Sequence, residues 1–196
     1  MVRPDSPAKT ARELIAYAES RPGDLNYAHT GPGGLPHMTG ELFKSAAGVD
    51  IVGVPYKSGG ESVTAVLGGQ VQMTFEGITI LLPLIREGKL HGLAVTSLDR
   101  FAATPELPTV AESGFPGFDV TASFGLMVAA GTPAAVIDKI HRDTVRVLAQ
   151  GELRQRLADI GVVAIGNSPA AFSAALKAEA VQWAKLIKEA GIRASE

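Results

Sequence analysis

The chain has 196 residues with a net charge of −2, and 46% of them are hydrophobic against 19% charged. This length and composition are typical of one large or two small globular domains with a buried core. The charge gives no electrostatic basis for binding nucleic acid or an anionic membrane. The absence of cysteine excludes disulfides, thiolate metal sites and a cysteine nucleophile. No apolar run reaches the roughly 18 residues of a membrane span, and no signal peptide is predicted in this chain.

Helix and strand patterns alternate through the first half of the chain. Helices are indicated by amphipathic runs ending at glycine or proline, and strands by β-branched residues or a period of two. The predicted helices cover 6–23, 36–48, 60–69 and 78–87. The predicted strands cover 24–30, 49–56, 70–77 and 89–97.

The second half begins with an ordered connection punctuated by proline and glycine, residues 98–117. Strands are predicted over 118–130 and 161–167. Helices are predicted after Thr132 and Ser168, each an expected N-cap followed by a proline. The last helix carries an apolar stripe that predicts a packed face: Phe172, Leu176, Ala180, Trp183 and Ile187.

This alternation predicts an α/β fold with a largely parallel sheet. In such sheets, ligands bind where strands end and helices begin. The stretch "NYAHTGPGGLPHMTGELF" lies at one of these junctions, and its glycines at Gly31, Gly33 and Gly34 allow close approach of the backbone to a ligand. Free amides at a helix start favour an anion, so the loop from His29 and Thr30 to His37 is a candidate carboxylate or phosphate site. The alternative is a tight turn that requires glycine.

A second junction, "VPYKSGGES", places Tyr56, Lys57 and Ser58 before Gly59 and another helix. Lys57 could meet a carboxylate and Ser58 could donate a hydrogen bond, or both could be solvated turn residues.

A third strand end carries Glu76 and Gly77. Glu76 could accept a hydrogen bond from an ammonium or hydroxyl group, or could cap the helix that follows, which is the favoured interpretation.

The histidines do not indicate a metal site. His37 and Glu41 lie four residues apart near His29, but no H-E-x-x-H spacing is present. His37, in the first turn of its helix, is better placed to orient the loop or to contact a ligand. No G-x-S-x-G motif or paired base is present, and no cofactor is predicted. Two anion-binding loops without a catalytic set are typical of a binding protein.

These residues resemble the extracytoplasmic solute receptors of tripartite tricarboxylate transporters, the Bug/TctC family. The resemblance runs from "PGDLNYAHTGPGGLPHMTGELF" through "VPYKSGGESVTAVLGGQVQMTFEG" to "LPTVAESGFPGF" and "FGLMVAAGTP". It implies a two-lobed, Venus-flytrap periplasmic binding protein for small carboxylates, with transporter membrane subunits as partners. It also implies that the ligand loops are His29–His37, Tyr56–Gly59 and Glu76–Gly77. Gly34, Ser58, Glu76 and Gly77 differ from the usual family residues, which leaves the preferred carboxylate open.

Family members have about 300 residues, so the resemblance implies that residues 1–122 form the second lobe and 123–196 half of the first. The opening part of the first lobe is then expected to be missing. An exposed apolar stripe on the last helix predicts a homodimer, or a C-terminal part repacked onto the second lobe. Two alternatives to a receptor are an enzyme that uses His37 and Glu76 as acid and base, and a fragment that binds nothing.

Overall fold

The computed structural model describes residues 1–192, apart from the side chains of residues 189 and 190. The chain forms two units. Among the described residues, one contains Met1–Ala122 together with residues 186–192, and the other contains Ser123–Lys185. Within the described residues, no helix is both long and apolar enough to cross a membrane.

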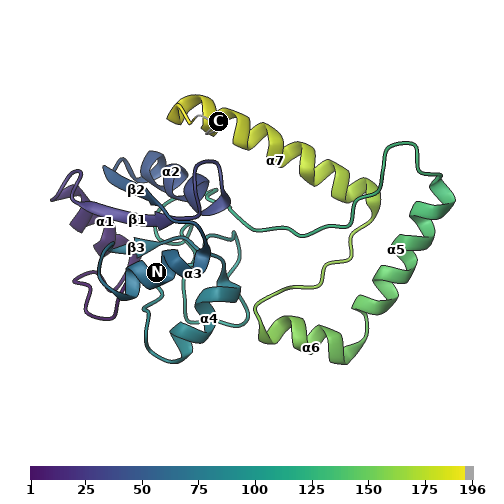
Figure 1. Ribbon diagram of the computed structural model, residues 1–196, viewed down its shortest axis with the longest axis horizontal. Coiled ribbons are helices and arrows are strands. Elements are labelled where there is room, and N and C mark those ends of the chain that lie inside the picture. The colour runs from purple at the N-terminus through teal and green to yellow at the C-terminus, as the bar shows by residue number, and fades with distance from the viewer. Residues whose placement is uncertain (193–196) are drawn as a thin grey trace. The chain divides into compact units, whose positions relative to one another are not determined.

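The first unit contains a three-stranded parallel sheet of order β2-β1-β3 (Figure 1). Strand β1 spans Leu25–His29, β2 spans Ile51–Pro55 and β3 spans Met73–Thr74. His29 is in register with Pro55, and Ala28 with Thr74. The carboxyl ends of all three strands therefore lie at the same edge of the sheet. Beyond β3, isolated antiparallel bridges join Val2 to Met73 and to His91.

The helices that lie wholly in the first unit are α1 (Ala11–Glu19), α2 (Leu35–Ala47), α3 (Gly59–Leu67) and α4 (Ile78–Arg86). The side chain of Thr10 accepts a hydrogen bond from the Glu13 amide and so caps α1. Helix α2 ends at Gly48, which has a φ of 65°. This left-handed conformation suits glycine, as the sequence predicts.

Helices pack on both faces of β1, because successive side chains of a strand point to opposite faces. Tyr27 lies against α2, where a Cβ atom on Gly40 would come within 2.3 Å of the tyrosine ring. Ala28 packs on the other side with Val63 and Val66 of α3 and Leu81 of α4. The result is the predicted α/β layering, with a close approach of α2 to the sheet that only glycine allows.

The predicted strand over 89–97 does not form as a regular strand. Only His91 and Val95 take part in isolated bridges. The connection over 98–117 is ordered, as predicted. Arg100 forms an ion pair with Glu112 at 2.9 Å, and the same carboxylate accepts a hydrogen bond from the Thr109 amide.

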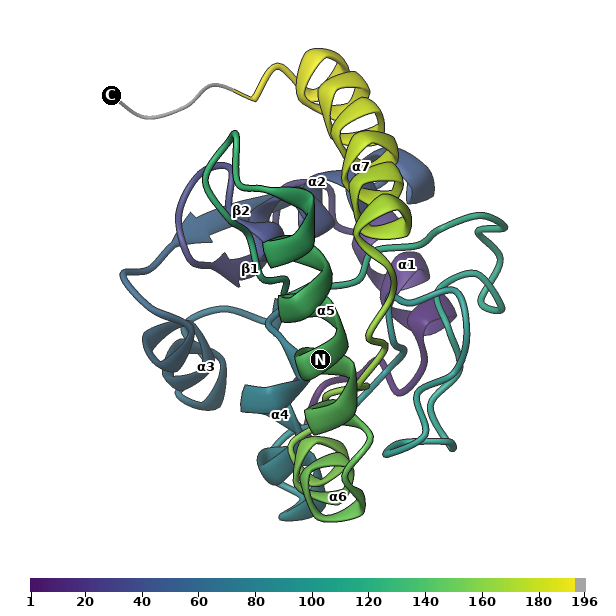
Figure 2. The same ribbon diagram turned by 90° about the vertical axis from the view of Figure 1, so that its right-hand side faces the viewer.

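The second unit is helical. It contains α5 (Ala134–Leu148), α6 (Gly151–Asp159) and most of α7 (Pro169–Ala190) (Figure 2). Two residues join α5 to α6, and a longer non-helical segment leads from α6 to α7. Ser168 caps α7 through a hydrogen bond from the Ala171 amide, as predicted. Thr132 does not cap α5. Its hydroxyl donates to the Ala129 carbonyl, and Pro133 occupies the cap position.

The strands predicted over 118–130 and 161–167 are wrong as regular strands, because neither segment is in a ladder within the described residues. A strand needs a neighbour for its backbone hydrogen bonds, and β-branched residues alone do not supply one. Phe124 is 87% exposed and Ile165 is 78% exposed. Among the described residues of this unit, only Gly161 is buried. The predicted stripe of α7 is only half-buried at Phe172, Leu176 and Trp183, and exposed at Ala180 and Ile187.

Candidate functional site

The three predicted ligand loops lie together at the carboxyl edge of the sheet. Each follows a strand: residues 30–34 follow β1, 56–58 follow β2 and 75–77 follow β3. The Tyr56 amide donates to the His29 carbonyl at 2.8 Å, which joins the first two loops. Glu76 lies next to Gly59, because a Cβ atom on this glycine would be 3.1 Å from Glu76 Oε2. The second and third loops are therefore also in contact.

The first loop requires glycine at two positions. Gly31 has a φ of 96° and Gly33 a φ of 77°, a conformation that other residues rarely adopt. A Cβ atom on either glycine would meet no other atom within 4 Å. These glycines therefore form the turn, and the space beside them is open. Gly34 has an extended backbone, but a Cβ there would lie 3.3 Å from the Thr30 hydroxyl.

The backbone amides of this loop donate hydrogen bonds to acceptors in the loop itself and in the residues on either side of it. Gly31 donates to His29 Nδ1 at 3.1 Å, and Gly33 donates to His37 Nδ1 at 3.2 Å. Gly34 donates to the Gly31 carbonyl at 3.3 Å. His37 thus orients the loop, one of the two roles predicted for it. The position of His29 in the loop was predicted from the sequence, whereas the hydrogen bond from the Gly31 amide to its ring was not.

Burial lowers the pKa of both histidines. The buried His29 also faces the neighbouring His37, which lowers its pKa further, while the charge of Glu41 works against the shift. For His37, Glu41 opposes the effect of burial and Lys44 adds to it. Both rings accept at Nδ1, so each carries its hydrogen on Nε2 when neutral.

A polar network lies beneath the histidines. The buried Tyr27 donates to Glu41 Oε1 at 2.8 Å, and Lys44 approaches the same oxygen at 3.2 Å. Burial raises the pKa of Tyr27, and its hydrogen bond to Glu41 adds to this. The sequence showed only that His37 and Glu41 share a helical face. The role of Tyr27 depends on the sheet and was not predictable from spacing.

The starts of α2 and α4 have no side-chain cap. Gly34 and Gly77 occupy the cap positions, and neither has a side chain that could accept a hydrogen bond. The first amides of a helix have no partner within the helix. Pro36 has no amide hydrogen. In the first turn of α2, the amides of Leu35 and His37 are therefore the ones that could donate hydrogen bonds to an anion. Glu76 does not cap α4, which corrects the favoured interpretation of this residue.

Helix α3 begins with a cap that resembles a capping box. The Glu61 amide donates to Ser58 Oγ at 3.2 Å, and Glu61 Oε2 accepts from the Lys57 amide at 3.2 Å. The S-x-x-E spacing in the sequence could have indicated this arrangement. Ser58 therefore has a structural role, although its hydroxyl hydrogen can still be donated. Lys57 is exposed, and Tyr56 is half-buried against the apolar cluster around Ala28.

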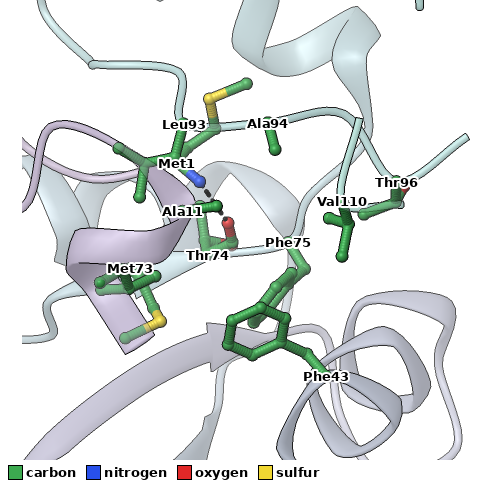
Figure 3. Close-up of a pocket in the computed structure, with 11 residues that line it drawn as sticks. Met1, Ala11, Phe43, Met73, Thr74, Phe75, Leu93, Ala94, Thr96 and Val110 are labelled. Carbon is green, nitrogen blue, oxygen red and sulfur yellow. Dashed lines mark hydrogen bonds between the residues drawn. The ribbon is translucent and has the colours of Figure 1, made fainter. Parts of the chain in front are cut away.

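A small apolar cavity lies near β3, between α1 and the chain at 93–96 (Figure 3). Phe43 and Phe75 line it together with Met73, Leu93 and Val110. Its volume is about 40 Å³, whereas pockets for organic ligands usually measure about 300–1,000 Å³. The cavity is therefore too small for an organic carboxylate. Among the described residues, no cluster of three or more His, Asp or Glu side chains is placed to hold a metal ion.

The chain belongs to the tripartite tricarboxylate transporter receptor family, whose sequence pattern matches residues 1–192. It is 32% identical over 180 residues to the protein BugT of Bordetella pertussis, covering 92% of this chain and 55% of BugT. It also resembles a solved R. palustris protein bound to adipate, with 32% identity and a TM-score of 0.88, over 97% of this chain and 64% of that one. The periplasmic binding protein BugD is similar, with 33% identity and a TM-score of 0.84, over 98% and 65% of the two chains.

These similarities confirm the predicted fold class, the α/β fold of the periplasmic binding proteins. The chain spans 55% of the length of BugT and 64% of the adipate-bound R. palustris protein. They also identify the class of protein: the family consists of solute receptors rather than enzymes.

Proposed function

We propose that this chain is the ligand-binding part of a solute receptor for a small organic carboxylate. In this proposal residues 1–122 are one lobe, and residues 123–196 contribute to the other. The receptor delivers its ligand in the periplasm to the membrane subunits of a tripartite tricarboxylate-type transporter. Family membership supports the transport role, and the adipate bound to one relative supports the carboxylate.

The observation that carries this proposal is the meeting of three strand-to-helix loops at one edge of the sheet. Helices α2, α3 and α4 all begin there, and two of them have glycine at the cap. Helix N-termini carry a partial positive charge and unpaired amides, so their convergence favours a carboxylate. The ligand-binding residues of this proposal are those of the predicted loops: His29, Thr30, Gly31, Gly33, Gly34, His37, Tyr56, Lys57, Ser58, Gly59, Glu76 and Gly77.

The direct test is isothermal titration calorimetry with a panel of dicarboxylates, aromatic carboxylates and acidic amino acids. A ligand that binds only the folded chain also raises its melting temperature in proportion to the logarithm of its concentration, which gives an independent measurement. Saturable binding of at least one carboxylate, without chemical change of that ligand, is the expected result. A panel without any binder would favour a fragment that binds nothing.

We infer that the chain does not catalyse a reaction. Membership of a receptor family supports this inference, and His37, whose Nδ1 accepts from the Gly33 amide, has no lone pair left on its neutral ring to act as a base. Product analysis by NMR after long incubation with each bound carboxylate tests this inference. Turnover that disappears in His37→Ala would contradict it.

A further inference from the structure

Glu76 has an unusual position at the proposed site. It follows β3 by two residues, directly before the cap residue of α4, and lies against the first residue of α3. A Cβ atom on Gly59 would approach Glu76 Oε2 to 3.1 Å and Ile80 Cδ1 to 2.7 Å. The missing side chain of Gly59 thus leaves the space that the carboxyl group occupies.

The carboxyl group of Glu76 is incompletely hydrogen-bonded. Its Oε1 atom is buried, and no donor within the described part of the chain reaches it. Burial raises the pKa of this carboxyl group, although hydrogen bonds from the Ser62 side chain and the Gly77 backbone to the carboxyl group act against this shift. A buried acceptor without a donor is unfavourable, and more so when it is charged. The side chain as a whole is only half-buried, so part of it reaches the surface.

The chemistry of this acceptor restricts what can lie beside it. A second carboxylate on a ligand would meet Glu76 as a like charge, which disfavours the pair unless one group is protonated. A hydroxyl or ammonium group would instead donate the missing hydrogen bond. The terminal bond of a glutamate rotates easily, so either oxygen can turn toward the donor.

We propose that Glu76 accepts a hydrogen bond from a donor group on the bound carboxylate, so that this receptor selects hydroxy- or amino-substituted organic acids. The inference rests on the proposed function, since it assumes that a carboxylate binds at the helix N-termini. Within that function, Glu76 determines the class of ligand.

Two matched ligand series test the proposal by calorimetry at pH 7. Succinate, malate and aspartate share a four-carbon chain and differ in a hydroxyl or ammonium group, and adipate and 2-aminoadipate form the longer pair. We expect the acids that carry a donor to bind at least about tenfold more tightly than the plain acid of their series. The ratio of malate to aspartate affinity distinguishes a hydroxyl from an ammonium donor.

The variant Glu76→Gln keeps the size of the side chain but removes its charge. It should reduce the preference for donor-bearing acids to less than about threefold, because a charged acceptor forms the stronger hydrogen bond. Glu106→Gln, an exposed position in the same unit, is the matched control and should keep the wild-type preference. Circular dichroism establishes that the variants are folded. If Glu76→Gln does not fold, the same affinity ratios are measured with Glu76→Asp and with the wild-type protein. The wild-type ratios then decide whether donor-bearing acids are preferred.

The failure of this inference differs from the failure of the receptor function. Equal affinity for plain and substituted acids in the wild-type protein would overturn the role of Glu76 and leave the carboxylate receptor intact. An undiminished preference in folded Glu76→Gln would do the same. If no acid of either series binds to the wild-type protein, the selectivity proposal fails together with its premise.

Discussion

The rings of His29 and His37 lie with their centroids 4.5 Å apart, and each accepts a hydrogen bond from a loop amide. Both bonds use Nδ1 as the acceptor, so both require a neutral ring. Protonation would place two like charges side by side and replace two acceptors by donors. The pair therefore holds the Gly31–Gly33 turn only while both histidines are neutral.

The first prediction concerns stability against pH. The unfolded chain protonates these histidines near pH 6.5, whereas the folded chain does so only at lower pH. Between those values the unfolded state binds more protons, so the free energy of unfolding should fall as the pH falls from about 6.5 through the lowered pKa values. Below them the contribution becomes constant. Urea unfolding from pH 8 to pH 5 measures this decline.

The double variant His29→Asn/His37→Asn provides the comparison. The amide oxygen of asparagine can replace Nδ1 as an acceptor, but it does not titrate in this range. The variant should therefore lose the part of the pH dependence that the two histidines contribute. Burial lowers the pKa of the Met1 amino group to about 5, which also makes stability fall as the pH falls, but equally in both proteins. Glu76, whose pKa is raised by burial, acts in the opposite direction in both proteins and cancels in the comparison. Parallel curves for the two proteins would exclude the histidine pair as the source.

The second prediction separates the loop from its lysine. Lys57→Ala should weaken carboxylate binding by about 1–2 kcal/mol, because it removes one exposed charge. Gly33→Val should weaken binding more, because Gly33 has a φ of 77° and a branched side chain there would distort the turn. Calorimetry with adipate, or with the tightest carboxylate of the panel, gives both affinities.

Gly88→Val is the matched control for Gly33→Val. Gly88 also has a positive φ, 67°, and open space around it, but it follows α4 rather than the first loop. Both substitutions should cost about 1–2 kcal/mol of stability, since the left-handed conformation disfavours a Cβ atom. Only Gly33→Val should also reduce affinity. Unchanged affinity in that variant would mean that the loop is a turn without a binding role.

The third prediction concerns the packing of α2 on the sheet. Gly40→Ala should destabilise the first unit by about 1–3 kcal/mol, because its methyl group would overlap the fully buried ring of Tyr27. Gly60→Ala in α3 is the control, since its Cβ would have only an ordinary contact at 3.8 Å. It should be neutral or slightly stabilising. Thermal unfolding of the two variants distinguishes these outcomes.

The elements predicted best from the sequence are those whose residue pattern depends only on nearby residues. Helix α2 ends at the predicted Gly48, and β1 and β2 follow the β-branched and apolar runs. The three loops meet at one edge because parallel strands place their carboxyl ends together, which the alternation of helices and strands implied. The residues of the candidate site could therefore be named before their contacts were known.

The sequence predicted least where the structure depends on distant partners. The segments 118–130 and 161–167 have strand-forming composition, yet no ladder forms on them within the described residues. The contacts of Tyr27 with Glu41 and Gly40 likewise join a strand to a helix that follows it in the sequence. Spacing along the chain does not encode such contacts. The unpaired Oε1 of Glu76 could not be recognised from its position alone, because burial is a property of the folded chain.

The last prediction follows from the apolar surface of the second unit. Phe124, Leu126 and Met127 are 87%, 70% and 73% exposed, and they lie on a segment that pairs with no strand among the residues that the structure describes. Exposed apolar side chains and unpaired backbone groups both favour association with a second copy. We expect a homodimer whose population increases with protein concentration, measured by light scattering coupled to size exclusion.

The double variant Phe124→Ser/Leu126→Ser should shift this equilibrium toward the monomer. Each substitution removes a large apolar side chain from the exposed segment and leaves the helices of the unit unchanged. Leu98→Ser is the control, because Leu98 is also exposed, at 54%, but belongs to the first unit. It should leave the dimer population as in the wild-type protein. A wild-type chain that stays monomeric at all concentrations would refute the dimer. Equal dimerisation of the two variants would instead place the interface away from the 124–127 segment.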